Sequence, residues 1–160
     1  MTTPLFQLLL DTLGGSEMDF DVAAENETIR LRIDGDDGKW TTYARVLPSR
    51  KLAIYSVADL HIPEARRPAM AEFLTRANFG IVVGNFEMDF DDGEVRYKTS
   101  LDSDGKVFPG ELIEHLLNAN LAHMNKYLPG IMGVGFGDLP PIEALRRCEK
   151  KPDPDAAAGA

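Results

Sequence analysis

Residues 85–99 read NFEMDFDDGEVRYKT, and the alternation of apolar and polar side chains in this stretch predicts a β-hairpin. Asp92-Gly93 lies at its centre, and an Asp-Gly pair is a favoured tight turn between antiparallel strands. The resulting register brings apolar residues together on one face and acids opposite bases on the other. The expected pairs are Phe90 with Val95, Met88 with Tyr97, Asp89 with Arg96, and Glu87 with Lys98.

The sequence before this hairpin predicts more strands of the same kind. A short half-buried strand is expected at 18–22, a hairpin at 29–47 and a further strand at 52–57. With a turn at Asp37-Gly38, the 29–47 hairpin buries one face and leaves charged residues on the other. The expected facing pairs are Ile33 with Thr42, Leu31 with Ala44 and Ile29 with Val46, while Arg30, Arg32, Tyr43 and Arg45 share the opposite face.

Segments in which apolar residues recur at helical spacing lie before, between and after the predicted strands. A first helix is expected at 4–13, a second at 63–78 and a long third at 109–128, which Pro129-Gly130 would end. Pro68 is out of place inside the second helix, so this helix either begins in earnest near Arg67 or has an irregular first turn. Residues 130–137 are expected to be extended or coiled, a short helix follows near 140–148, and 151–160 form a disordered tail.

The element order α-β-β-β-α-β-β-α, with a short C-terminal helix, predicts the α+β class. We expect a sandwich in which helices pack on a twisted antiparallel sheet. The length of 160 residues suits one domain, at 1–150.

Composition excludes several classes of protein. One cysteine rules out a disulfide framework and any site built from several cysteines. A formal charge of −9 argues against general nucleic-acid binding, which needs a basic surface. The sequence shows neither a signal peptide nor a run of apolar residues long enough to span a membrane, so a cytoplasmic protein without membrane contact is expected.

Patterns that would indicate catalysis or cofactor binding fail on spacing or context. The glycines of 130–137 follow a helix and precede prolines, whereas a phosphate-binding loop needs a strand before it and a helix after it. The acidic runs 34–37 and 89–94 lack the calcium-loop pattern and are interpreted as turns. His115 and His123 are out of line on one helix, and Cys148 lies in no nucleophile motif. We therefore predict no catalytic residue, no metal site and no cofactor.

Two features indicate a surface for a polypeptide partner. Phe6 and Leu10 form a second apolar face on the first helix, either covered by the core or free to meet a partner, and Leu112 and Leu116 lie on the long helix. Acidic segments either are simply solvated or steer a basic partner. The candidate partner-binding residues are Phe6, Leu10, Leu112, Leu116, Glu87 and Asp89.

The order and spacing of several short segments resemble those of the YbjN family of bacterial proteins, described as sensory transduction regulators. These segments span much of the region 3–148: Ile62-Pro63-Glu64, 74–80 (LTRANFG), 84–87 (GNFE), 92–97 (DGEVRY), 127–132 (YLPGIM) and 141–145 (PIEAL).

That family is similar in fold to type III secretion chaperones, small acidic proteins that bind partner polypeptides and are often dimers. The resemblance implies a non-enzymatic, chaperone-like or regulatory protein that binds a protein or peptide, with a homodimer as a second expectation. The alternative is a domain that senses a small ligand or nucleotide in a pocket between sheet and helices.

Overall fold

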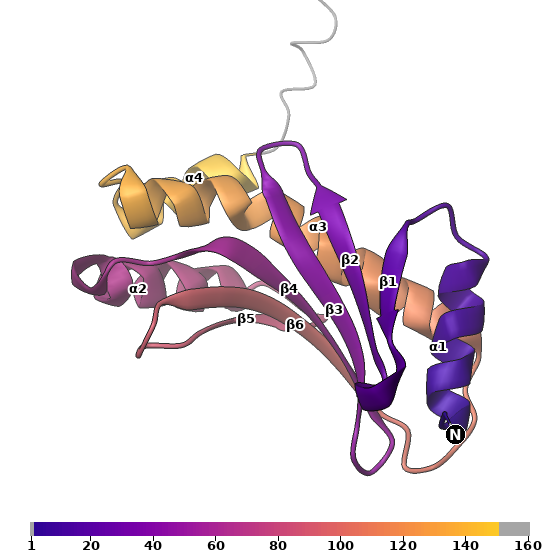
Figure 1. The fold of residues 1–160 in the computed structure, drawn as a ribbon. Helices are drawn as coiled ribbons and strands as arrows, with labels where there is room; N and C mark the ends of the chain where they lie inside the picture. Colours follow the sequence, from indigo (N-terminus) through magenta and orange to yellow (C-terminus); the bar gives the residue numbers. More distant parts are fainter. Residues whose placement is uncertain (1, 151–160) are drawn as a thin grey trace, which may run out of the picture.

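The strands form one six-stranded sheet, and the amphipathic helices pack on one of its faces (Figure 1). The computed structural model describes residues 2–150. The predicted tail at 151–160 lies outside them. Within the described residues the helices are α1 (Pro4–Gly14), α2 (Arg67–Asn78), α3 (Gly110–Phe136) and α4 (Pro141–Glu149), and the strands are β1 (Phe20–Ala23), β2 (Thr28–Asp34), β3 (Lys39–Leu47), β4 (Lys51–His61), β5 (Asn85–Met88) and β6 (Glu94–Asp102).

The sheet is antiparallel throughout and has the order β1-β2-β3-β4-β6-β5, which confirms the predicted α+β class. The strands predicted at 18–22, in the 29–47 hairpin and at 52–57 all form, which makes four strands before α2, so the predicted element order counts one strand too few there. Phe20 pairs with Leu31, so the short β1 is a separate edge strand. The chain reverses between β1 and β2 through a 3₁₀ turn that ends at Glu27, which has a positive φ of 46°.

Both predicted hairpins form, but each is shifted by two residues from the predicted register. Ile33 pairs with Trp40 and Glu87 pairs with Arg96, because each turn is longer than a two-residue loop. The backbone N–H of Gly35 donates to the carbonyl of Gly38, and that of Asp89 donates to the carbonyl of Glu94. Because side chains alternate with a period of two, a shift of two residues leaves every side chain on its predicted face.

Two hydrophobic clusters fill the space between sheet and helices. The first lies beneath α1 and the beginning of α3, and the second lies between β5, β6, α2, α4 and the remainder of α3. Asn120 of α3 is fully buried where the sheet passes from β4 to β6. Its amide nitrogen donates to the carbonyls of Ile54 and Tyr97 and to Oγ1 of Thr99.

Helix α3 is longer than predicted, and the expectation of an extended or coiled segment at 130–137 is wrong. The helix continues through Pro129, which costs about 3 kcal/mol inside a helix, because Ile131 and Val134 are fully buried against the core. Its glycines allow neighbours to approach closely. A Cβ atom on Gly130 would overlap the ring of Phe73 and lie 2.8 Å from Sγ of Cys148.

The awkward position of Pro68 has a simple solution in the structure. A 3₁₀ turn at Glu64–Arg66 (η2) precedes the helix, and α2 begins at Arg67. Pro68 is therefore in the first turn, where its missing N–H has no helical acceptor to lose. The predicted later start of this helix is confirmed.

We expect the substitution Gly130→Ala to lower the free energy of unfolding by about 1–3 kcal/mol, because the added methyl group must displace the ring of Phe73. Gly14→Ala is the matched control, since a Cβ there meets no atom within 4 Å. That change should leave stability equal or slightly higher. Urea unfolding followed by circular dichroism measures both, and equal stability of the two variants would contradict the proposed close packing.

Candidate functional site

The face of the sheet that is turned away from the helices is open to solvent. Side chains on this face alternate along each strand with residues that are buried beneath the helices. Its members come from every strand and are mostly charged or aromatic. We call this surface the open face; its acidic, basic and tyrosine members are Asp21, Arg30, Arg32, Asp34, Lys39, Tyr43, Arg45, Lys51, Tyr55, Asp59, Glu87, Glu94, Arg96, Lys98 and Asp102, and Thr41 and Val57 lie among them.

Strand register assembles an aromatic and cationic row across the middle of the open face. Tyr43 of β3 pairs directly with Tyr55 of β4, and both tyrosines are half-buried. Arg30 pairs with Tyr43 on one side, and Lys98 pairs with Tyr55 on the other. The guanidinium carbon of Arg96 lies 4.6 Å from the centroid of the Tyr55 ring, which is a cation–π contact.

Two carboxylates on the open face are each shared by two cations. Asp21 lies 2.7 Å from Nη2 of Arg30 and 3.4 Å from Nη2 of Arg32. Glu87 likewise forms ion pairs with Arg96, at 2.8 Å, and with Lys98. These ion pairs fix the positions of the cationic side chains and neutralise only part of their charge.

Arg45 is a further cation of the open face, and it is exposed and forms no ion pair within residues 2–150. The open face thus carries seven lysines and arginines against six carboxylates, a net charge of +1 in a chain of net charge −9.

Ionisation of the shared carboxylates reflects these contacts. A hydrogen bond from Arg30 lowers the pKa of Asp21 and raises the pKa of Arg30. At Glu87, partial burial opposes ionisation, but hydrogen bonds from Lys98 and Arg96 outweigh it and hold the pKa of Glu87 below its ordinary value. Both carboxylates are therefore charged at neutral pH and attract the cations beside them.

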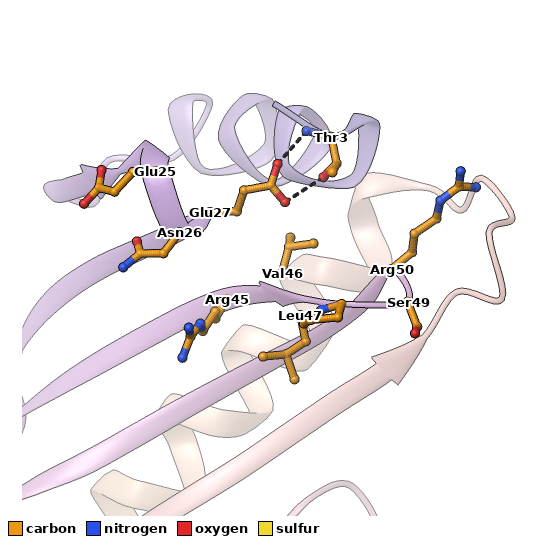
Figure 2. A pocket seen from close by; sticks show the side chains of 10 residues that line it. Thr3, Glu25, Asn26, Glu27, Arg45, Val46, Leu47, Ser49 and Arg50 are labelled. Carbon is orange, nitrogen blue, oxygen red and sulfur yellow. Dashed lines mark hydrogen bonds between the residues drawn. The ribbon is translucent and has the colours of Figure 1, made fainter. Parts of the chain in front are cut away.

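A pocket lined by several polar and charged residues adjoins the open face where α1 begins, and Figure 2 shows the side chains that line it. Its volume is about 430 Å³. The backbone N–H and the hydroxyl of Thr3 donate to the carboxylate of Glu27, and Oγ1 of Thr3 caps the helix by accepting from the N–H of Phe6, at 3.2 Å. Arg45 lines this pocket and also belongs to the open face, so the two surfaces are continuous.

A second hollow, of about 440 Å³, lies on the other side of the start of α1 and is mainly apolar. Leu5, Leu8, Val107 and Phe108 line it, and Arg50 borders both hollows. Both hollows lie beside the start of α1, where Thr3 lines each of them. The space between sheet and helices, where the alternative hypothesis places a ligand pocket, is occupied by the side chains of the two hydrophobic clusters.

The structure separates the six residues that the sequence predicts for partner binding. Phe6 is fully buried in the cluster beneath α1, so its expected contact with a partner is wrong for this fold. Leu10 and Leu116 are partly buried against the same cluster, and Leu112 is partly exposed nearby on α3. Both apolar faces of α1 belong to the core, because Leu9 and Leu13 of the other face are buried too.

The two acidic candidates lie on the opposite edge of the sheet, on β5 and its turn. Glu87 is paired within the chain, as described above. Asp89 is exposed, and its carboxylate accepts a hydrogen bond from the N–H of Asp91, at 2.9 Å. Asp92 similarly accepts from the N–H of Glu94, and Gly93 has a positive φ of 82°. The interpretation of this acidic run as turn-forming is confirmed.

Sequence reasoning placed Arg30, Arg32, Tyr43 and Arg45 on one face but missed the larger surface to which they belong. Tyr55 joins them through the pairing of β3 with β4. Arg96 and Lys98 join them only because β4 pairs with β6, two strands separated by α2 and β5 in the chain. The available signal was the pair of alternating basic residues at 96 and 98. Nothing in their spacing identifies the neighbouring strand.

The described part of the chain offers little reactive chemistry. Within residues 2–150, no group of three or more His, Cys, Asp or Glu side chains is arranged to hold a metal ion. Burial raises the pKa of the Cys148 thiol, which disfavours the nucleophilic thiolate. The ring of His123 stacks on Tyr97, with centroids 5.0 Å apart, and Nδ1 of this histidine lies 2.7 Å from the carbonyl of Ala119.

We expect Glu87→Gln to lower stability at neutral pH and to lose its effect in acid. The ion pairs of Glu87 stabilise the fold above the ordinary glutamate pKa of about 4.3, and this contribution disappears as the pH falls through the lowered folded-state pKa. Urea unfolding of the variant and the unmodified chain, repeated between neutral and acidic pH, measures the difference. Glu114→Gln on the exposed side of α3 is the control, and a difference for Glu87→Gln that is independent of pH would contradict this account.

Comparison with known proteins gives a family match and no match to a curated protein. No helix within residues 2–150 is both long enough and apolar enough to cross a membrane. A family model described as "Putative bacterial sensory transduction regulator" matches residues 6–131, which is most of the chain. The family description supports a regulatory role, and it does not name an enzyme. Because the match covers far more than half of its length, the chain belongs to the YbjN family.

Proposed function

We propose that this chain is a non-enzymatic, chaperone-like regulator that works in the cytoplasm by binding another polypeptide on the open face. The single observation that carries the proposal is the row of Tyr43 and Tyr55 between Arg30 and Lys98, on a sheet face that no helix within residues 2–150 covers. Tyrosine and arginine are enriched at protein interfaces and at the residues that dominate binding energy. The regulatory description of the family is consistent with such a role.

The shape of the open face also favours a polypeptide partner. A sheet face several strands wide offers a broad surface, whereas small ligands bind in concave pockets that bury most of their area. The half-buried tyrosine rings are held in place by neighbouring strands and, at Tyr55, by Arg96. Binding therefore orders few additional side chains and loses little conformational entropy.

Ligand sensing is the second candidate function, and one observation favours it. The apolar hollow beside α1 combines Leu5, Leu8 and Phe108 with the basic side chains of Arg50 and Lys106. That combination suits a small amphipathic molecule with a negative charge. A rise in melting temperature on adding a fatty acid, absent in Leu8→Gln, would favour this candidate over the first.

Site-specific photo-crosslinking in bacterial cells tests the proposed polypeptide binding. A photoreactive phenylalanine analogue in place of Tyr43 or Tyr55 should give covalent adducts of discrete mass, because both side chains face the expected partner. The same analogue at Asn118, an exposed position on α3, should give none of these adducts.

The charge reversal Arg45→Glu in the chain labelled at Tyr55 should reduce adduct formation by about tenfold. Arg146→Glu on α4 makes the same change of charge away from the open face and should have no effect. The proposal is contradicted if the open-face positions give no adduct, or if all three labelled positions give the same adducts.

The homodimer expected from the sequence remains a prediction. Its support is the α1–α3 side of the molecule, where Leu10, Leu112 and Leu116 are partly exposed. Sedimentation velocity at micromolar concentration should then give twice the chain mass of 17.6 kDa. A species of 17.6 kDa alone would exclude the dimer and leave the open face unaffected.

A further inference from the structure

We infer that the occupant of the open face is an extended, acidic segment of the partner polypeptide, held by its carboxylates between the cations and over the tyrosine pair. This inference rests on the proposed function and adds the chemical class of the partner. It depends on how charge is distributed over the molecule.

Positive charge is concentrated on the open face far above its share of the chain. Seven of the seventeen lysines and arginines lie there, from strands β2, β3, β4 and β6. The rest of the chain must carry a net charge of −10, because the whole chain has −9 and the open face has +1. At physiological salt, charges are screened beyond about 8 Å, so a bound segment responds mainly to the cations next to it.

These cations retain capacity for further carboxylates. Each arginine has five N–H donors, and Asp21 alone serves both Arg30 and Arg32. The side chain of Arg32 is 72% exposed, and Arg45 has no carboxylate partner within residues 2–150. Carboxylates from a partner would supply the missing acceptors without displacing the existing ion pairs.

The dimensions of the row suit a short extended peptide. Arg30, Tyr43, Tyr55 and Lys98 lie on four adjacent strands, which spans about 14 Å at the usual strand spacing. An extended segment of about four or five residues covers this distance. Its carboxylates can then reach the cations at both ends of the row while its other side chains lie against the tyrosine rings.

Two other occupants fit the open face less well. In a symmetric dimer, a two-fold axis would place this cationic surface opposite its own copy, and like charges facing each other are unfavourable. A nucleic-acid strand brings one charge with every nucleotide and needs many cationic contacts to release its counterions. A face of net charge +1 on a chain of net charge −9 provides few such contacts.

Fluorescence anisotropy with defined probes tests the inference. The probes are a fluorescein-labelled peptide of sequence EYEYEYEG, its basic counterpart KYKYKYKG and an eight-nucleotide oligothymidylate. We expect the acidic peptide to bind at about 50 mM salt, to weaken at least about tenfold near 300 mM salt and to bind best of the three.

The double variant R32E/R45E should weaken binding of the acidic peptide by at least about tenfold. K106E/R146E is the matched control, because it makes the same change of charge at exposed positions outside the open face, and its affinity should stay within about twofold. The salt dependence of the unmodified chain tests the inference even if the double variant unfolds.

The outcomes separate this inference from the proposed function. Stronger binding of the basic peptide, lost in R32E/R45E, would overturn the acidic class and leave polypeptide binding in place. Binding of oligothymidylate alone, lost in the same variant, would overturn both. Loss of a dimer in R32E/R45E during sedimentation would assign the open face to a second copy, and absence of binding by every probe would also overturn the inference.

Discussion

The pairing of β4 with β6 is the contact on which the remainder of the structure depends. It joins two strands that α2 and β5 separate along the chain, and it turns a four-stranded unit and a hairpin into one sheet. Asn120 lies beneath this junction and donates hydrogen bonds to both strands. Helix α3 thereby fixes the junction, and its two ends pack against different hydrophobic clusters. This pairing extends the open face across the whole sheet, since it brings Lys98 of β6 beside Tyr55 of β4.

Local patterns in the sequence predict most of the elements but not the contacts between distant ones. Period-two alternation identifies the strands and the face of each residue, and a two-residue error in both turns leaves those faces unchanged. The extent of α3 could not be predicted from local signals, because Pro129 and Gly130 ordinarily end a helix. Tertiary packing overrides that tendency here: Gly130 has no side chain, and the ring of Phe73 occupies the space.

The candidate site was harder to predict than the fold for a related reason. Its residues are ordinary surface arginines, lysines and tyrosines in sequence, and only the strand order makes them neighbours. Phe6 shows the opposite error, because a second apolar stripe on a helix can be covered by the same protein as readily as by a partner. The net charge was a similarly incomplete guide, since the total of −9 conceals one surface of opposite sign.

The lengths of the strands also limit how this protein can meet another. The inner strands β3 and β4 have nine and eleven residues, whereas the edge strands β1 and β5 have only four each. A short edge exposes few free backbone N–H and C=O groups, which makes the sheet a poor template for adding a strand. A partner that adds a strand to the sheet edge contacts mainly backbone groups, whereas a partner bound on the face contacts side chains. A sheet built this way resists self-association through its edges and favours selection of partners by their side-chain chemistry.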